Sequence, residues 1–585
     1  MILNRKNYLI VLLIVLSGLV FAFNLNNPLF WDDDEWIKAN PYVHDLKHLK
    51  EIFSQDILSG FGLTSNYYRP LLLVSFAINY VLHGMAPFGY HLVNNGLHIA
   101  NGILLYLLFR NLFNRRLAFI TALFFLIHPV QTEAVSYISG RGDPLSVFFM
   151  LLGIWLFIKS QIADQRRGWW RAGALVAMIL AILSRETGIL FPLLLTIYLA
   201  AFNVGERILK NIWLTVKSTW PFYLISLLYF LLRLTVLNFK NTLNFYAQAN
   251  DYTQHLSYRL YTFCYALMEY FKLIIFPRNL HMERDLALKT SLWQWPVGLA
   301  AVVIVVWVAG LVWFYRRQRG AGVRNSNFRV LFFFTAFFFV AMAPVSGVLP
   351  INAIIYEHWL YLPLVAISLL FAYYVDKLLV FLEARSSWRQ TVIIGLVVYF
   401  GYFAVVSMKR NIMWGDAETF YLDIIKYNPD TVRILNNLGN LYSEKRELGK
   451  AAEFYQRAIA NPNGGIFAQP YYNLGNIFRD TGKPEEAIKQ YHKAIAVDPN
   501  FTFAYQNLAV VYVNQGKFNE AAEVLEKLKI IKPGEPRLYY NLSLVYLALK
   551  KNTLAIENLR LTQQYSVFDP EAGKAAEALL KEIEK

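Results

Sequence analysis

The sequence contains a single cysteine in 585 residues, Cys264, and it lies in an apolar stretch rich in aromatic residues. One cysteine cannot form a disulfide within the chain, so disulfide-stabilised scaffolds are excluded. A lone cysteine among apolar neighbours is typically a small core residue. The cysteine count therefore says little about the compartment in which the protein resides.

The short motifs that bind nucleotides or zinc are also missing. The sequence has no Gly-x-x-x-x-Gly-Lys-Ser/Thr phosphate loop and no Rossmann glycine pattern, which leaves a nucleotide-driven pump or a soluble nucleotide-sugar domain without support. It has no His-Glu-x-x-His or paired-cysteine pattern either. His128 and Glu133 are five residues apart, which separates them by about 140° around a helix. We therefore predict no metal site, and no cofactor is firmly implied.

Charged residues are scarce, at 16% of the chain, whereas hydrophobic residues make up 56%, too apolar for an ordinary soluble protein. The net charge of +16 lies almost entirely before residue 409, where 33 Lys/Arg face 19 Asp/Glu; the remainder holds 23 against 21. The excess occupies short loops such as Asn114–Arg116 and Arg166–Arg171, the positive-inside bias of a membrane protein. A nucleic-acid partner is not predicted, because it would need a basic face on a soluble module.

Apolar runs and basic loops together predict a polytopic bundle of about eleven membrane-spanning helices. The run from Tyr8 to Phe23 follows Arg5 and Lys6 and lacks a cleavage site, so it is interpreted as an anchor with a cytoplasmic N-terminus. The loop of residues 24–89 is then extracytoplasmic. Tyr68–Leu82 and Tyr258–Phe276 are predicted to lie in the interface, since the first is short and the second, counted as a span, would put a basic loop outside. We expect a cell (inner) membrane protein with an extracytoplasmic tail, or an ER membrane protein with a lumenal tail in a eukaryote.

The C-terminal tail contains the clearest internal repeat. Leu474-Gly475, Leu508-Ala509 and Leu542-Ser543 recur every 34 residues, the tetratricopeptide (TPR) period, and Leu438-Gly439 begins an earlier repeat offset by two. Four repeats are enough to stack a continuous helical core with a concave face that binds peptides or proteins. The predicted fold class is all-α. The predicted domains are a membrane domain at 1–408, a linker at 409–430, a TPR domain at 431–570 and a C-terminal helix at 571–585.

A run of carboxylates, Asp32, Asp33, Asp34 and Glu35, stands directly outside the first span. Close carboxylates repel one another, so the pKa of at least one should rise, which suits a general base that takes a proton from a hydroxyl. The alternative is a solvated acidic loop that caps the next helix. The cluster needs partners elsewhere in the chain before catalysis is favoured.

Other ionisable residues map to the same outer membrane face under this topology. Charges at membrane depth are costly and are functional candidates by default. Arginine and histidine would hold a phosphate and stabilise it as a leaving group. The alternative is structural ion pairs, such as Arg185 with Glu186 or Arg141 with Asp143. The candidates are Arg69, His91, His128, Glu133, Arg141, Asp143, Arg185, Glu186, Arg278, Arg284, Glu357 and His358.

His91 also belongs to a polar stripe with Asn94, Asn95, His98 and Asn101 at helical spacing. Such a stripe is more often a set of interhelical contacts than a catalytic row. His91 stays a site candidate because it lies nearest the outer surface.

Several sequence blocks occur in an order that is specific to one known family, although no single block is decisive. They are Asp32-Asp33 with Ile37 to Pro41, Tyr68 to Leu71 with His83-Gly84 and Pro87 to His91, His128 to Val135 with Gly140 to Asp143, Ser184 to Gly188, Phe276-Pro277, and Glu357 to Pro363. With the repeat tail, this set resembles the transmembrane and tetratricopeptide-repeat O-mannosyltransferases, the TMTC family of the GT-C class, which also contains the protein O-mannosyltransferases.

The resemblance implies transfer of a hexose, typically mannose, from a polyprenyl phosphate to a Ser or Thr hydroxyl of an extracytoplasmic protein, with little or no need for metal. A single displacement would invert the anomeric carbon, with Asp32 or Asp33 as the base; Asp34 leaves that choice open. The TPR groove would recruit the acceptor protein. Arg185 and His358 depart from the family, which usually has lysine and arginine there. The short repeat set is typical of a prokaryotic relative.

Two other functions stay open at this point. A non-enzymatic membrane scaffold that assembles an envelope complex would explain the repeats but would leave the outer-face charges without a purpose. A GT-C transferase that glycosylates a lipid or polysaccharide would explain those charges, but protein-binding repeats argue against it.

Overall fold

The computed structural model describes residues 8–61, 65–162, 166–202, 208–237, 250–317, 326–351, 353–461, 467–566 and 569–583. Within these ranges the chain forms helices and no strand, which confirms the all-α prediction. The chain divides into two compact units, Met1–Phe420 and Tyr421–Lys585. Arg5 and Lys6, on which the predicted orientation of the first span depends, lie outside the described residues.

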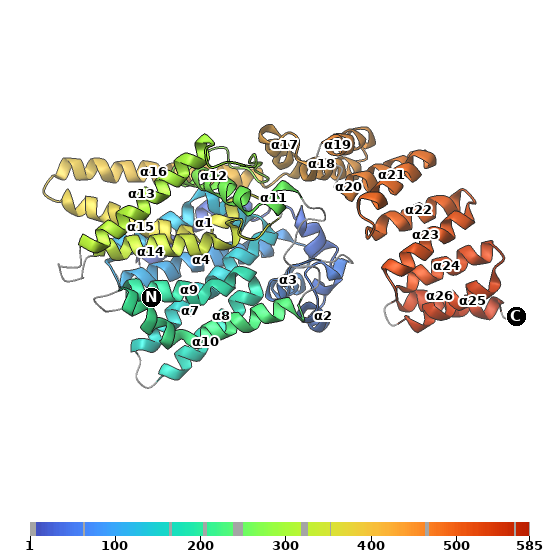
Figure 1. Cartoon of the computed structure of the whole chain (residues 1–585), viewed down its shortest axis with the longest axis horizontal. Helices are drawn as coiled ribbons and strands as arrows, with labels where there is room; N and C mark the ends of the chain where they lie inside the picture. The colour runs from blue at the N-terminus through green and yellow to red at the C-terminus, as the bar shows by residue number, and fades with distance from the viewer. Residues whose placement is uncertain are drawn as a thin grey trace. The chain divides into compact units, whose positions relative to one another are not determined.

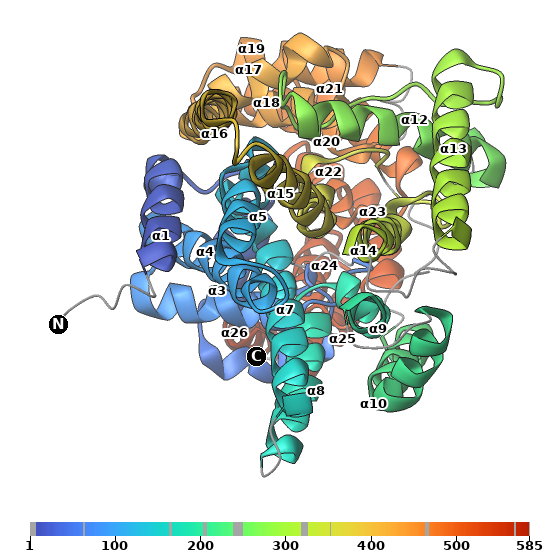
Figure 2. The same cartoon turned by 90° about the vertical axis from the view of Figure 1, so that its left-hand side faces the viewer.

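The first unit is a bundle of helices joined by short turns of tighter or wider helix (Figures 1 and 2). Its longer helices are α1 (Tyr8–Phe21), α3 (Pro70–His83), α4 (Pro87–Arg110), α5 (Arg115–Ile127), α7 (Gly142–Ile162), α8 (Arg167–Ser184), α9 (Phe191–Phe202), α10 (Ile208–Leu234), α12 (Leu256–Ile275), α13 (Trp295–Arg317), α14 (Ser326–Met342), α15 (Leu364–Phe381) and α16 (Ser386–Met413). The short elements that matter for the site are α6 (Thr132–Ser136) and the turns η2 (Asp34–Lys38), η6 (Pro129–Gln131), η7 (Ile138–Arg141), η8 (Glu186–Leu190) and η11 (Glu357–Leu360).

Among the described residues, six helices are long and apolar enough to cross a membrane, as expected of a multi-pass membrane protein. They span Pro87–Arg110, Ile138–Ile162, Trp295–Trp313, Asn327–Val345, Leu364–Phe381 and Ser386–Met413. Tyr8–Asn24, Pro70–His83 and Glu186–Phe202 are apolar but shorter. The count of eleven spans stays a prediction.

A seventh candidate span is broken, because α5 and residues 129–136 meet at a bend of 52°. The bend falls at His128, where φ is −67° and ψ is 127°. A residue that precedes proline avoids the helical conformation, so Pro129 ends α5 at this point. The segment after the bend packs against η11 and the end of α16, and this brings Glu133 into the site described below.

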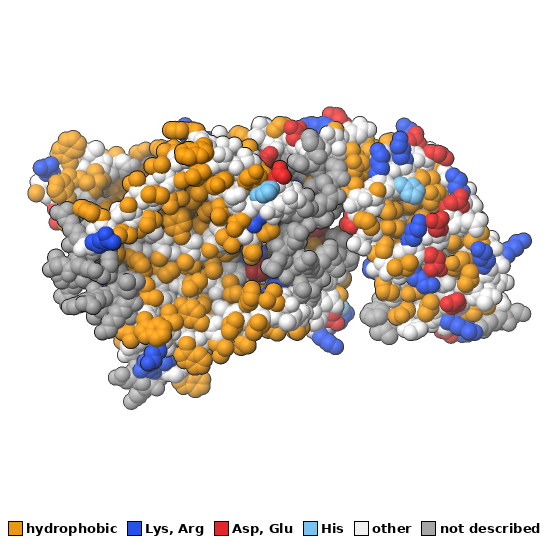
Figure 3. Space-filling view, viewed as in Figure 1, with side chains coloured by type: hydrophobic (Ala, Val, Ile, Leu, Met, Phe, Trp, Pro, Cys, Tyr) orange, Lys and Arg blue, Asp and Glu red, His pale blue; other side chains and the backbone are white. Residues whose placement is uncertain are grey.

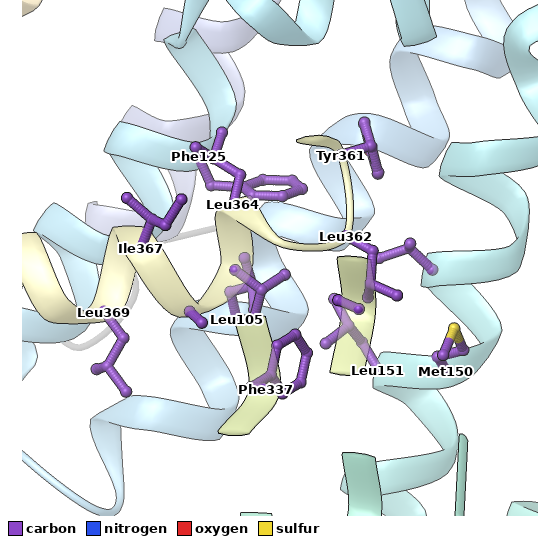
Figure 4. Packing of buried hydrophobic residues seen from close by; sticks show 14 of the residues in the cluster. Leu105, Phe125, Met150, Leu151, Phe337, Tyr361, Leu362, Leu364, Ile367 and Leu369 are labelled. Atoms are coloured by element: carbon purple, nitrogen blue, oxygen red, sulfur yellow. The ribbon is translucent and has the colours of Figure 1, made fainter. Parts of the chain in front are cut away.

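Close-packed side chains from α4, α5, α7, α14 and α15 form the core of the membrane unit (Figure 4). Leu105, Phe125, Leu151, Phe337 and Leu364 are each at most 2% exposed. Lipid is as apolar as these side chains, so the helices are held by dense packing and by interhelical hydrogen bonds.

The polar stripe of α4 supplies such hydrogen bonds. His98 Nδ1 lies 2.8 Å from the Tyr361 hydroxyl, and the Asn101 amide donates to the same oxygen at 3.0 Å. Asn94 donates to the Val135 carbonyl at 3.1 Å. These members of the stripe therefore join helices, as the structural interpretation of the pattern predicted.

Hydrophobic side chains cover much of the outer surface of this unit (Figure 3). In the most apolar 18-residue stretch of α13 only 11% is buried, and the same share is buried in that of α16. Valines on these helices, such as Val305 and Val398, are about two-thirds exposed. Water would penalise a surface of this kind, whereas a lipid bilayer does not. These faces are suited to contact with lipid.

The second unit consists of helix pairs in the described part of the tail (Figure 1). The pairs are α18 (Val432–Glu444) with α19 (Leu448–Ala460), α20 (Ala468–Asp480) with α21 (Pro484–Val497), α22 (Thr502–Asn514) with α23 (Phe518–Ile531), and α24 (Pro536–Ala548) with α25 (Asn552–Gln564), followed by α26 (Pro570–Ile583). The segment predicted as a linker, 409–430, contains the end of α16 and α17 (Ala417–Tyr427).

The Leu-Gly signature of the repeats has a packing cause. A Cβ atom on Gly475 would lie 2.7 Å from the ring of Tyr491, and one on Gly439 would lie 2.3 Å from the ring of Tyr455. Only a residue without a side chain allows the second helix of these two pairs to pack its tyrosine against the first; in the third and fourth pairs, Ala509 and Ser543 replace the glycine and Leu525 and Leu559 replace the tyrosine. The glycine of the repeat signature is thus required by close packing between the two helices of a pair.

Candidate active site

The acidic turn after α1 separates the aspartates. Trp31 has φ of +67°, unusual for a residue with a side chain, and its carbonyl accepts from the Asp34 amide at 3.0 Å. Asp33 is buried, at 2% exposure, whereas Asp34 is at the surface and pairs with Lys38 at 2.6 Å. Asp32 lies between these extremes. The turn therefore directs one of the predicted carboxylates into the protein and another outward.

Asp33 is held by hydrogen bonds from η7. One carboxylate oxygen accepts from the Ser139 amide at 2.9 Å and from the Ser139 hydroxyl at 2.5 Å, and the other accepts from the Phe30 amide at 3.3 Å. Burial raises the pKa of Asp33 to about 7, and the charge of Asp32 adds to the rise, while the three hydrogen bonds oppose it. A carboxyl with this pKa exchanges its proton near neutral pH, which is what a general base requires.

A pair of ion bridges lies where α3, α7 and α8 begin or end. The Arg69 guanidinium donates to both carboxylate oxygens of Glu186, at 2.9 and 3.2 Å, and lies 4.5 Å from the centre of the Tyr67 ring. The Arg185 guanidinium pairs with the Asp143 carboxylate. Asp32 lies within electrostatic range of Tyr67, and so do Arg69, Glu186 and Arg185.

The chain turns sharply after α8, and this turn places Arg185 and Glu186. Gly188 fits there because a Cβ atom on it would lie 2.5 Å from the backbone of Ile182. Arg185 is extended, with φ of −159°, so the helix ends at Ser184 and η8 folds back against it. The two neighbouring ionic side chains consequently bind different partners. The sequence-based alternative that pairs Arg185 with Glu186 does not describe them.

A second charged group joins α6 and η11, two elements more than 200 residues apart in the sequence. Glu133 is fully buried; one carboxylate oxygen contacts His358 Nδ1, and the other accepts from the Glu357 amide at 3.1 Å. Burial lowers the pKa of His358 to about 3, so its ring is neutral at neutral pH. The ionised Glu133 carboxylate can only accept, so in that state it favours the His358 tautomer that has its hydrogen on Nδ1 and its lone pair on Nε2.

Glu357 is the centre of this second group. Its first carboxylate oxygen accepts from the His281 amide at 2.8 Å and from Arg284 at 3.2 Å, and its second lies 3.6 Å from a guanidinium nitrogen of Arg410. Burial raises the pKa of Glu357, and the charges of Arg410 and Arg284 oppose that rise. Both groups influence the pKa of His358. Asp143, Arg185 and Arg69 of the first group act on its ring through their charges, and so does Glu357 of the second group. The two sets of ion bridges therefore form one electrostatic cluster.

Three predicted residues have mainly structural partners. Arg141 is fully buried and donates to Asn94 at 2.6 Å, to Ser75 at 3.1 Å and to the Tyr90 carbonyl at 3.0 Å. The structural alternative that pairs Arg141 with Asp143 does not describe it, because Asp143 binds Arg185.

Both ring nitrogens of His128 meet backbone groups, the Ile274 carbonyl at 2.9 Å and the Val130 amide at 3.3 Å. His91 Nε2 lies 3.0 Å from the Asn27 carbonyl. These residues fix the elements that surround the cluster and do not join its ion pairs.

The sequence reasoning missed two residues of the site. Ser139 is one, because an isolated serine carries no pattern. Arg410 is the other, although it lies three residues after Ser407 and directly before Asn411, so all three share one face of α16. Polar residues at that spacing on an apolar helix are a recognisable signal.

Comparison with known proteins agrees with the predicted resemblance. Residues 88–232 match the family model described as dolichyl-phosphate-mannose-protein mannosyltransferase. Four TPR models match residues 414–466, 475–516, 504–531 and 536–561. The blocks His128 to Val135, Gly140 to Asp143 and Ser184 to Gly188 all fall within the first match.

Relatives with curated names are similar over most of the chain. Protein O-mannosyl-transferase F38B6.6 of Caenorhabditis elegans is 25% identical over 510 residues, 84% of this chain and 63% of its own length. Protein O-mannosyl-transferase TMTC3 of Mus musculus is 23% identical over 496 residues, 80% of this chain and 52% of its own. TMTC1 of the same species is 42% identical over 139 residues, 22% of this chain and 15% of its own. The chain thus spans about half to three-fifths of the length of the first two relatives.

Solved structures match the repeat region. The structure of the MamA protein is 25% identical with a TM-score of 0.24, covering 27% of this chain and 85% of that one. YrrB, described as a TPR protein with an unusual peptide-binding site, is 21% identical with a TM-score of 0.24, covering 30% and 89%. Scores this low add nothing to the repeat assignment, which rests on the family models. The chain resembles the TMTC-type protein O-mannosyltransferases over most of its length and combines a mannosyltransferase-like membrane part with TPR repeats.

Proposed function

We propose that the protein is a membrane glycosyltransferase that moves a hexose, mannose by resemblance to its relatives, from a polyprenyl phosphate to Ser or Thr hydroxyls of extracytoplasmic proteins. The observation that carries the proposal is Asp33, a buried carboxyl with a pKa of about 7 whose neighbour Asp32 lies within electrostatic range of Tyr67, as do Arg69 and Arg185. A scaffold would have no use for charged groups that are so costly to bury.

The proposed reaction is a single displacement at the anomeric carbon. Asp33 accepts the proton of the acceptor hydroxyl, the hydroxyl oxygen forms a bond to C1 of the sugar, and the C1–oxygen bond to phosphate breaks. The electron pair of that bond leaves with the polyprenyl phosphate. Because the hydroxyl attacks C1 on the side opposite to the leaving phosphate, the configuration at C1 inverts. Asp32, which is more exposed, is the neighbour that tunes the base or replaces it. Asp34 is the weakest of the three candidates, because its carboxylate pairs with Lys38 at the surface.

The leaving phosphate requires positive charge, and Arg69 and Arg185 are suited to supply it. Their side chains are 10% and 13% exposed, so each keeps access to a ligand while it is paired with a carboxylate. A planar guanidinium binds phosphate oxygens in pairs, and Glu186 and Asp143 hold the two groups in place. Glu133, Arg284, Glu357 and His358 complete the donor site, and His91, His128 and Arg141 shape its walls.

The repeat unit is proposed to recruit the acceptor protein, because stacked TPR helices present a concave surface for peptides. This requires that the acidic turn and the repeats face the same compartment. We therefore propose a cytoplasmic N-terminus, an extracytoplasmic tail and a location in the cell (inner) membrane, or in the ER membrane in a eukaryote.

The direct test uses the purified full-length protein in detergent with polyprenyl-phosphate mannose and unstructured Ser/Thr-containing peptides. Mass spectrometry should find a hexose on the peptides, and the Asp32→Asn/Asp33→Asn double variant should lose the activity. Asp34→Asn is the matched control, since it makes the same chemical change at the surface. Full activity of the double variant would overturn the proposal. Transfer to co-purified lipid or polysaccharide, with unmodified peptides, would replace the protein acceptor by that class.

A further inference from the structure

The last membrane helix, α16, brings a buried arginine to the charged cluster. Arg410 is 4% exposed. Its helix is fixed on either side, because Ser407 donates to the Ile127 carbonyl at 3.0 Å and Asn411 accepts from the Ser136 hydroxyl at 2.5 Å. The same face of α16 therefore lies along residues 127–136, and the charge of Arg410 acts on Glu133 as well as on Glu357.

The hydrogen-bonding capacity of this arginine is unused. None of its three nitrogens has a hydrogen-bond partner among the described residues, and the Glu357 oxygen that lies 3.6 Å from one of them is too distant for a hydrogen bond. That Glu357 oxygen also lacks a hydrogen-bond partner in the ranges described. Arg284 keeps its Nε unpaired beside the same carboxylate. Protein interiors leave few such groups unpaired, so unpaired atoms of opposite kind in one place indicate a ligand.

Gln131 carries both kinds of unpaired group on a neighbouring element. It is fully buried in η6, a turn that packs against α16 and η11, and within the ranges that the structure describes neither its amide nitrogen nor its amide oxygen has a partner. The unpaired donors are therefore the guanidinium of Arg410, the Nε of Arg284 and the Gln131 amide nitrogen. The unpaired acceptors are one Glu357 oxygen and the Gln131 amide oxygen.

The mixture of donors and acceptors determines which ligand fits. A phosphate group can only accept at neutral pH, so it would leave the Glu357 and Gln131 oxygens unpaired and would be repelled by Glu357 and Glu133. The charges of these two carboxylates are balanced by Arg284 and Arg410, so the junction has no excess positive charge. A hydroxyl group both donates and accepts, and a neutral ligand with several hydroxyls can satisfy every one of these atoms.

We propose that Arg410, Glu357 and Gln131 form a subsite for the hydroxyl groups of a hexose, the sugar of the lipid-linked donor. The proposal rests on the function proposed above and deepens it, because it separates the sugar from the phosphate, which is assigned to Arg69 and Arg185. Arg410 and Gln131 are then specificity residues that read the sugar and take no part in binding the polyprenyl phosphate.

The experiment compares two probes on the purified full-length protein, a short polyprenyl-phosphate mannose and the same polyprenyl phosphate without sugar, by calorimetric titration in detergent. The wild type should bind the sugar-bearing lipid more tightly. Arg410→Met should lose that preference by roughly tenfold to a hundredfold, the effect expected for hydrogen bonds to a charged group, and should keep its affinity for the bare lipid phosphate. Lys409→Met is the matched control, because it removes a neighbouring exposed charge of the same helix.

Gln131→Met provides a second variant in case the loss of Arg410 prevents folding. Methionine has nearly the same shape, and it removes a buried amide that has no partner in the described part of the chain, so folding should be unaffected or improved. This variant should also lose the preference for the sugar-bearing lipid. Unchanged preference in both variants would mean that the unpaired atoms bind only water and would overturn the subsite.

The two proposals fail in different ways. A wild-type protein that binds both lipids equally has no sugar subsite, although the glycosyl transfer can still be observed. A loss of affinity for both lipids in Arg410→Met would assign the arginine to the phosphate and refute its role in reading the sugar. A wild-type protein that binds neither lipid refutes the polyprenyl-phosphate donor itself.

Discussion

Replacing Asp33 with asparagine should make the protein inactive and, above neutral pH, more stable. The carboxyl is 2% exposed and its pKa rises from 3.8 to about 7. At about 1.4 kcal/mol per pKa unit, the ionised form costs the folded state up to about 4 kcal/mol. Because the pKa is raised on folding, the folded protein holds the proton longer than the unfolded chain, and stability falls as pH increases from about 4 to about 7.

Asparagine removes this cost because it cannot ionise. The gain should be smaller than the ceiling, since the amide nitrogen cannot accept the hydrogen bond that Phe30 donates to the carboxylate. Asp33→Asn should therefore melt a few degrees above the wild type at pH 8 and at nearly the same temperature at pH 5. Its kcat should fall roughly 10²- to 10⁴-fold, as expected when a general base is removed.

The assay pairs a thermal-shift measurement at the two pH values with transfer of mannose to a Ser/Thr peptide. The wild-type rate should rise with pH through about 7 and then level off, because the ionised base is the active form. Asp34→Asn should change neither the melting temperature nor the rate appreciably. A variant at position 33 that keeps most of its activity, or whose stability relative to the wild type is the same at both pH values, would refute the assignment of Asp33 as a buried base.

Three further predictions concern other parts of the molecule. Arg69→Met should lower both the rate and the melting temperature, because it leaves Glu186 without its ion-pair partner, whereas Arg69→Met with Glu186→Met should recover the melting temperature without the rate; a recovered rate would show that the pair is only structural. Gly475→Val should destabilise the repeat unit in a thermal scan because its side chain would collide with the Tyr491 ring, while affinity for the lipid donor stays the same; Gly449→Val, at an open position, is the control. A C-terminal reporter that is active only outside the cytoplasm should give a signal, and a signal from a C-terminal reporter that is active only in the cytoplasm would reverse the proposed topology.

Most of what could be predicted about the fold came from periodic patterns in the sequence. The 34-residue spacing of Leu474, Leu508 and Leu542 reflects helix pairs that the structure contains. The predicted topology placed the charged residues near the span ends on one membrane face. In the structure, Glu133 indeed contacts Glu357 and His358, which are 224 and 225 residues away in the sequence. Sequence could group these residues because ionisable side chains are so rare in the membrane part.

The partners within that group could not be predicted, because they depend on local backbone geometry. Asp33 turns inward and Asp34 outward because Trp31 adopts a positive φ, which no sequence pattern announces. Arg185 binds Asp143 instead of its neighbour because the turn at Gly188 is tight. Arg410 was missed, since its burial becomes evident only when α16 is packed against η6.

The junction between the two units limits how the protein can be divided or recombined. The membrane unit ends at Phe420, whose ring lies 5.3 Å from Phe30 and 4.3 Å from Trp414, and Arg410 lies ten residues earlier. A chain cut at residue 408 would lose Arg410 and the aromatic residues that support the acidic turn. Exchange of repeat arrays between relatives should therefore succeed only when the join falls after Phe420. The array can then diversify, while the twelve residues 409–420 evolve with the membrane unit.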